Sequence, residues 1–104
     1  MHKRTKLLDI SKAVKDKVWE RDGHRCILCE SIFAMPNAHY ISRAQGGLGI
    51  PENVVTLCYA CHDQYDNGAD GREMKPRIAA YLRSQYPDWD ERKLVYRKYG
   101  LPDM

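Results

Sequence analysis

Residues 53–62 read Asn53-Val54-Val55-Thr56-Leu57-Cys58-Tyr59-Ala60-Cys61-His62. The β-branched run Val54–Leu57 predicts a strand. A short helix is expected to begin inside the Cys-x-x-Cys pair and to run from Tyr59 to about Asn67, where Asn67-Gly68 ends it. This stretch therefore predicts a strand that leads directly into a helix, with two thiols at the junction.

A second Cys-x-x-Cys pair lies upstream, and no cysteine is left over. Each pair brings two sulfurs toward one point, and a tetrahedral Zn²⁺ takes four such ligands. A disulfide or redox role is the weaker interpretation, because the chain is expected in a reducing compartment and a thioredoxin-like motif needs one pair in a βαβ setting. The sequence therefore predicts a structural zinc site made by Cys26, Cys29, Cys58 and Cys61.

A helix is expected before the first cysteine pair, from about Ser11 to Arg21. Ser11 can cap it, Val14 and Val18 share one face, and Asp22-Gly23 ends it. This helix would cover part of a core that is too small to be stable alone.

Between the two cysteine pairs the pattern is less regular. Residues 31–42 carry short apolar runs broken by Pro36 and Asn37, which predicts either a strand pair or an extended arm, with His39 in the second part. Residues 45–49 are rich in glycine and are expected to form a loop that passes close to another part of the chain.

The C-terminal part of the chain is predicted to be a helical extension, from about residue 72 to residue 100. Pro76 is expected near the start of one helix, which carries an apolar stripe from Ile78 to Tyr86 and ends at Pro87. Asp88 and Glu91 form a candidate capping box for a last helix.

Length and composition favour one globular domain that spans residues 1–104. The formal net charge of +3 and the isoelectric point near 8.7 permit nucleic-acid binding without requiring it. No segment is apolar and long enough for a membrane span or a signal peptide, so we expect a cytoplasmic protein with no membrane partner.

The segment between the cysteine pairs resembles the HNH endonuclease family in its zinc-stapled, four-cysteine branch. The resemblance covers about residues 14–68 and rests on Ala38-His39-Tyr40-Ile41-Ser42-Arg43, Gly46-Gly47, Pro51-Glu52-Asn53 and Cys61-His62. It implies an α+β fold with a ββα-metal (His-Me finger) core, clamped by the zinc site and flanked by N- and C-terminal helices. It also implies metal-dependent hydrolysis of phosphodiester bonds in double-stranded DNA, by nicking or double-strand cleavage. Free-standing members of this size resemble nucleases encoded by phages or mobile elements, which would place this one in the host cytoplasm.

The resemblance also implies roles for individual residues. His39 would be the general base, because a histidine can accept a proton from water at neutral pH. Asn53 would brace the loop and orient the histidine. His62 would bind the catalytic metal, and Asp66, four residues further along the helix, is a candidate second ligand for Mg²⁺ or Mn²⁺. Arg43 is the nearest candidate for a phosphate contact.

One residue departs from the family pattern. The position before the general base is commonly Asp or His and binds the metal, but here it is Ala38. Asp66, another residue or water would fill the gap, unless metal affinity is weakened or the site is degenerate. The alternative function is therefore a zinc-dependent nucleic-acid-binding module that does not cut. Either function could use Lys12 and Lys15 on the N-terminal helix for DNA contacts, and a protein partner that presents the DNA is possible.

Overall fold

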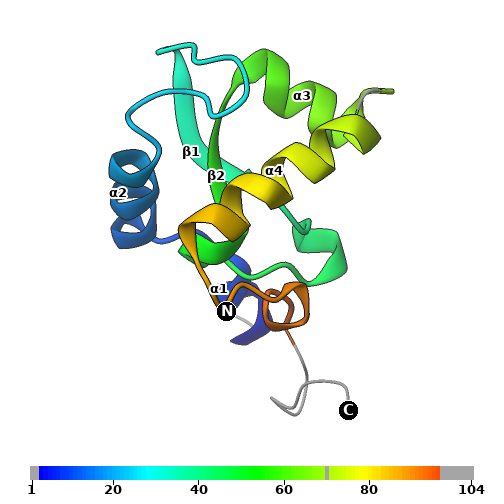
Figure 1. Ribbon diagram of the computed structural model, residues 1–104. Coiled ribbons are helices and arrows are strands. Elements are labelled where there is room, and N and C mark those ends of the chain that lie inside the picture. The colour runs from blue at the N-terminus through cyan, green and yellow to red at the C-terminus, as the bar shows by residue number, and fades with distance from the viewer. Residues whose placement is uncertain (1–2, 70, 97–104) are drawn as a thin grey trace.

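The computed structural model describes residues 3–69 and 71–96 (Figure 1). They form a small α+β fold in which helices surround a single two-stranded antiparallel sheet. No helix in this part of the chain combines the length and the apolar character needed to cross a membrane. The regular elements, in chain order, are α1 (Lys3–Leu8), α2 (Lys12–Arg21), β1 (Ala34–His39), β2 (Val54–Cys58), α3 (Tyr59–Asn67) and α4 (Gly71–Gln85), with 3-10 turns at Arg43–Gln45, Pro51–Asn53 and Glu91–Lys93.

The predicted strand and helix of residues 54–67 are confirmed. Strand β2 ends at Cys58, which has an extended backbone and is the N-cap residue of α3. The helix ends where Gly68 donates its backbone N–H to the carbonyl of Gln64. The helix before the first cysteine pair is confirmed as well, because the Ser11 hydroxyl accepts a hydrogen bond from the backbone N–H of Val14.

Residues 31–42 hold one strand, so the predicted strand pair is wrong and the extended arm is confirmed. The partner of β1 is β2, with Ala34 opposite Cys58 and His39 opposite Val54. The register shifts between Met35 and Ala38, across the Pro36-Asn37 step. Proline has no N–H to donate to the ladder, so a bulge is the usual way for a strand to accommodate it.

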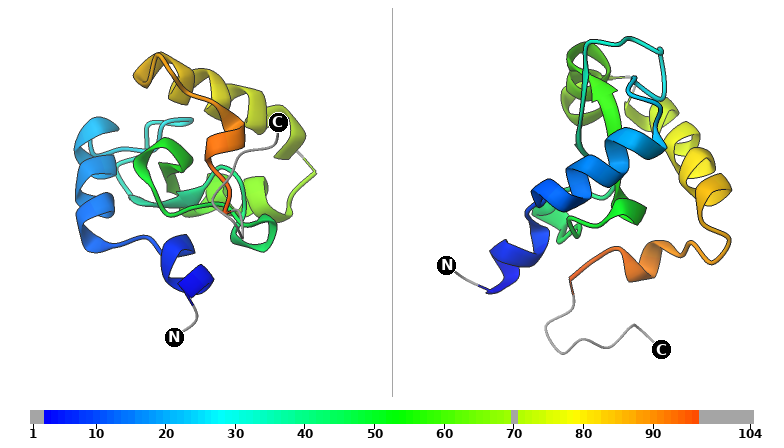
Figure 2. Two further views of the ribbon diagram at one scale, coloured as in Figure 1. Left: turned by 90° about the horizontal axis from the view of Figure 1, so that it is seen from below. Right: turned by 90° about the vertical axis from the view of Figure 1, so that its left-hand side faces the viewer.

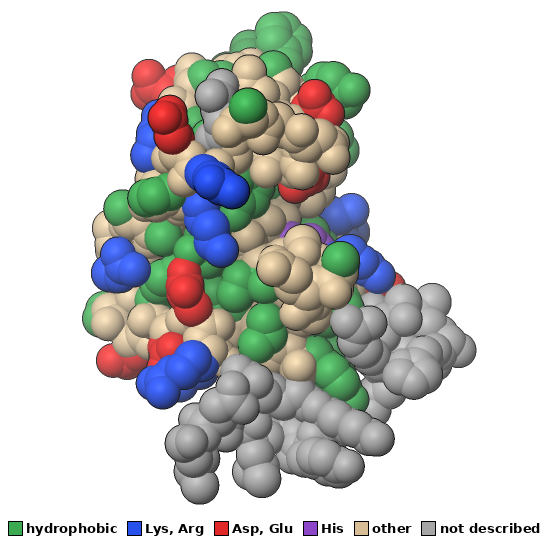
Figure 3. Space-filling model, turned by 90° about the vertical axis from the view of Figure 1, so that its right-hand side faces the viewer, with side chains coloured by type: hydrophobic (Ala, Val, Ile, Leu, Met, Phe, Trp, Pro, Cys, Tyr) green, Lys and Arg blue, Asp and Glu red, His purple; other side chains and the backbone are tan. Residues whose placement is uncertain are grey.

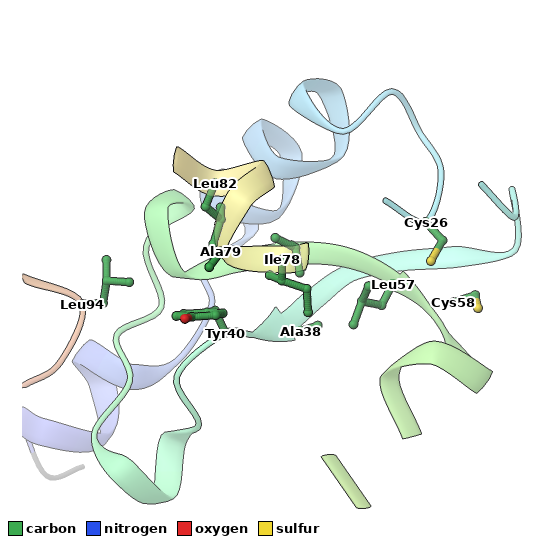
Figure 4. Packing of buried hydrophobic residues seen from close by; sticks show 10 residues of the cluster. Cys26, Ala38, Tyr40, Leu57, Cys58, Ile78, Ala79, Leu82 and Leu94 are labelled. Carbon is green, nitrogen blue, oxygen red and sulfur yellow. The ribbon is translucent and has the colours of Figure 1, made fainter. Parts of the chain in front are cut away.

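The hydrophobic core lies between the sheet and α4. Val55 and Leu57 of β2 pack in one cluster with Ile78 and Leu82 of α4, and Figure 4 shows the side chains of that cluster meeting. Helix α2 contacts both strands and buries Val18 completely. Figure 2 shows α2 and α4 on either side of the hairpin. Cover on both faces explains why every residue of β2 is buried.

A buried ionic network joins the end of α2 to the sheet and to α4. The guanidinium of Arg21 contacts the carboxylate of Asp22 at 2.7 Å and donates to the carbonyl of Val54 at 2.7 Å. Asp22 also accepts from the backbone N–H of Thr56 and from the hydroxyl of Tyr81. Asp22 therefore both ends α2 and links the helix to β2 and α4, a role that the sequence pattern does not indicate.

Two predictions for the C-terminal part are wrong. Pro76 lies inside α4, because the helix begins five residues earlier, at Gly71. The expected last helix is a single 3-10 turn, Glu91–Lys93, and its cap is Asp90 rather than Asp88. Beyond it, Val95 pairs with Gly47 in an isolated bridge. Residues 97–100 of the predicted extension lie outside the described residues.

Candidate metal centre and active site

The four cysteines meet at one point although they come from two distant segments. Their sulfur atoms all lie within 4.8 Å of one another, an arrangement placed to hold a metal ion. Among the residues that the structure describes, no other group of three or more His, Cys, Asp or Glu side chains converges in this way. The four residues are those that the sequence predicts to form a metal site: Cys26, Cys29, Cys58 and Cys61.

Backbone hydrogen bonds shape both halves of the cysteine cluster. The sulfur of Cys58 caps α3 and accepts from the N–H of Cys61 at 3.4 Å. Burial of Cys26 disfavours its thiolate, but hydrogen bonds from the backbone of Cys29, Cys58 and Leu28 outweigh that effect and lower its pKa to about 7. Donors aimed at sulfur favour the deprotonated form, which is the form that binds metals.

His39 ends β1 and is held by the N-terminal segment. Its Nε2 lies 2.9 Å from the backbone carbonyl of Leu8. A carbonyl oxygen only accepts, so Nε2 carries the proton and Nδ1 is left as the basic nitrogen. Burial lowers the pKa of His39 below its ordinary value of 6.5, and the positive charge of Arg43 acts in the same direction. The ring is therefore neutral at neutral pH.

Asn53 is fully buried and braces the loop after His39. Its Oδ1 accepts from the N–H of Ile41 at 2.8 Å, and its Nδ2 donates to the carbonyls of Ile41 and Leu48. A Cβ on Gly47 would lie 1.7 Å from the Ile41 carbonyl oxygen, so only glycine fits there. Asn53 thus acts on the loop as expected, while the contact that holds the histidine ring comes from Leu8.

His62 and Asp66 meet on one face of α3, as their spacing predicts. Nε2 of His62 lies 3.1 Å from Oδ2 of Asp66. Asp66 and His39 border one open pocket of about 370 Å³. His62 borders a different hollow, which it shares with apolar residues such as Phe33 and Tyr59. The α3 pair therefore stands between two hollows, and only its carboxylate faces the one with His39.

The three predicted DNA contacts lie at different places. Arg43 forms an ion pair with Asp9 beside the His39 pocket. Lys12 and Lys15 are exposed on α2, where Lys12 pairs with Asp16 at 2.9 Å. None of the three lines the His39 pocket.

The pocket also contains residues that the sequence analysis did not select. Arg72 and Lys75 of α4 line it together with His39 and Asp66. Figure 3 faces this side of the molecule and shows a small area of histidine surface with Lys and Arg side chains on either side of it. Both residues fall at the start of the predicted helical extension, about residues 72–100, but nothing in the sequence pattern assigned them a role. The role of the Leu8 carbonyl had no signal, because any residue supplies a backbone oxygen.

A protein from Nostoc sp. named Anaredoxin is 28% identical to this chain over 58 residues. The match covers 55% of this chain and 76% of Anaredoxin. No known protein family matches the chain. No solved structure matches it either.

Proposed function

We propose that this protein is a metal-dependent endonuclease of the HNH type that hydrolyses phosphodiester bonds in DNA. The observation that carries the proposal is the environment of His39. Its imidazole is neutral, its Nε2 donates a hydrogen bond to the Leu8 carbonyl, and its ring borders an open pocket that Asp66 also lines. The order of β1, β2 and α3, with the cysteine cluster at one end, also agrees with the ββα core of that family.

His39 would act as the general base at Nδ1. A phosphodiester resists hydrolysis because water is a poor nucleophile toward an anion, and removal of a water proton during attack lowers that barrier. General bases of this kind contribute about 10²–10⁴ in rate. The fixed Nε2 contact gives the ring one orientation, and Asn53 keeps the adjoining loop in place. Pre-positioning of this sort makes proton transfer efficient.

A catalytic Mg²⁺ or Mn²⁺ would be held by His62 and Asp66. A nitrogen and a carboxylate oxygen 3.1 Å apart form a suitable but incomplete donor set, since these ions take more ligands, many of them water. When bound, such an ion would neutralise charge on the phosphate and on the departing oxygen. Ala38 contributes nothing to it, because its side chain is fully buried in the core.

We further propose that the cysteine cluster holds a structural Zn²⁺. Zinc with Zn–S bonds of about 2.3 Å places four tetrahedral sulfurs about 3.8 Å apart. The sulfurs of Cys29 and Cys58 are 3.5 Å apart, and all four lie within 4.8 Å of one another. Four thiolates in a closed set are typical of a structural site.

A nucleic-acid-binding module without cleavage is the second candidate. It is favoured by the small number of candidate ligands for a catalytic metal. His62 and Asp66 provide two donors, and the buried Ala38 stands where the family pattern has a third. Divalent-metal-dependent cleavage of supercoiled plasmid, compared between the wild-type protein and His39→Ala, separates the two functions.

A further inference from the structure

Helix α4 begins at the pocket that contains His39. Arg72 and Lys75 lie in its first two turns and line that pocket, three residues apart on the same face. Both side chains are exposed to solvent.

The two cations are less engaged than Arg43 and Lys12, two of the residues predicted to contact DNA. Arg43 is paired with Asp9, and Lys12 with Asp16. Arg72, by contrast, has no hydrogen-bond or ion-pair partner among residues 3–69 and 71–96. Lys75 places its Nζ 5.4 Å from the centre of the Tyr40 ring, a cation–π contact that directs the ammonium group without neutralising it.

Tyr40 ties the position of Lys75 to that of His39. It follows His39 in the chain, its ring is buried, and its carbonyl accepts from the hydroxyl of Tyr65 at 2.6 Å. Because the ring is fixed, the ammonium group over it is held at the edge of the pocket that His39 borders.

The charge balance of the pocket is positive. Asp66 is the one carboxylate among its described lining residues, and that carboxylate contacts His62. Arg72 and Lys75 supply two positive charges. An anion that approaches Nδ1 of His39 therefore meets more positive than negative charge, which draws a phosphate backbone inward.

We propose that Arg72 and Lys75 form a phosphate clamp that binds the backbone of a nucleic-acid strand beside His39. The clamp rests on the proposed function, because it explains how the scissile strand is held at the general base. Arg72 can take a phosphate through two parallel N–H donors, and Lys75 acts as a point charge. Contacts of this kind carry no sequence information, so the clamp recognises a polynucleotide backbone rather than particular bases.

The test measures equilibrium binding of a fluorescein-labelled 20-base-pair duplex by fluorescence anisotropy over a series of salt concentrations. The zinc-loaded protein is used without Mg²⁺ or Mn²⁺, and a gel verifies that the duplex stays intact. The variants are Arg72→Gln, Lys75→Gln and the double variant. Lys17→Gln on α2 is the matched control, since it removes the same charge from an exposed position outside the pocket.

The logarithm of the association constant falls with the logarithm of the salt concentration. Each single clamp variant is expected to make this negative slope shallower by about 0.9, and the double variant by about 1.8. At about 0.1 M salt, each loss corresponds to about eightfold weaker binding. Lys17→Gln should leave the slope unchanged. The thermal unfolding midpoint of every variant should match the wild type, because these side chains are exposed.

The outcomes separate the clamp from the nuclease. A double variant that binds with the wild-type slope, or a wild-type protein that does not bind the duplex, overturns the clamp. Plasmid cleavage with Mg²⁺ or Mn²⁺ is measured in parallel. If the slopes fall as expected but the wild-type protein never cleaves, the clamp stands and the nuclease proposal fails.

Discussion

The imidazole of His39 donates from Nε2 to the backbone carbonyl of Leu8 across 2.9 Å. This contact joins the end of α1 to the end of β1. The same segment packs against the glycine-rich loop, where Gly49 donates its N–H to the carbonyl of Leu7 and a Cβ would lie 2.1 Å from the Asp9 carbonyl oxygen. The N-terminal segment is therefore part of the candidate active site, although it lies outside the region that resembles HNH nucleases.

The first prediction concerns the pH dependence of cleavage. Burial lowers the pKa of His39 below 6.5, so the neutral base is the main form at pH 7 and is lost only as the pH falls through that lower value. The ratio kcat/KM for plasmid nicking should rise with pH below 6.5 and be level from there to pH 8. A rise centred above pH 7 would contradict the assignment of His39 as the base.

Local structure was predictable from the sequence where short-range rules apply. The cap at Ser11, the end of α3 at Gly68 and the four-cysteine cluster follow from residue types and spacing. The course of β1 was harder, because Pro36 reads as a break between two strands but is accommodated by a bulge in one. Pro76 reads as a residue near a helix start, but it lies inside α4, which begins at Gly71.

Long-range contacts could not be predicted at all. Arg21 and Asp22 look like an ordinary helix end, yet they form a buried pair whose partners lie about 30 to 60 residues away in sequence. The contact between His39 and the Leu8 carbonyl is of the same kind, and so is the placement of Arg72 near His39. Each depends on how distant segments pack rather than on a local pattern.

Asp22→Ala tests the buried ionic network. The substitution leaves the guanidinium of Arg21 without its counter-ion, and breaking a buried pair typically costs about 3–5 kcal/mol. Urea denaturation followed by circular dichroism measures the loss. Asp16→Ala is the control, because its pair with Lys12 is exposed and should contribute about 1 kcal/mol or less. Equal losses in the two variants would contradict the role of the network.

Ala38→Asp tests what the departure from the family pattern means. Aspartate is common at this position in the family, but here the side chain is fully buried beside Leu57 and Ile78. A carboxylate in that core lacks a partner, so we expect a loss of several kcal/mol in the free energy of unfolding and no gain in cleavage. Ala44→Asp, at an exposed position in the following 3-10 turn, is the control. A stable Ala38→Asp variant that cuts faster would show that the site is short of this ligand.

Cys58→Ser tests the proposed zinc site. The substitution removes one of the four sulfurs but leaves a residue that can cap α3, so the variant should lose bound zinc and with it the cooperative thermal transition. Cys29→His is the matched variant, because Cys29 is exposed and three cysteines with one histidine are a common zinc ligand set. It should retain zinc, measured by elemental analysis of the purified protein. Normal folding of Cys58→Ser without metal would rule out a structural role.

Metal-dependent cleavage of supercoiled plasmid is the most direct test of the proposed nuclease. The assay compares wild-type protein with His39→Ala in Mg²⁺, in Mn²⁺ and without added divalent metal. His24→Ala is the matched control, because His24 is exposed and lies outside the His39 pocket. We predict nicked or linear product with the wild-type and His24→Ala proteins when metal is added, and a rate about 10²–10⁴ lower with His39→Ala. Equal cleavage by His39→Ala, or binding of the plasmid with no cleavage in either metal, would contradict the account.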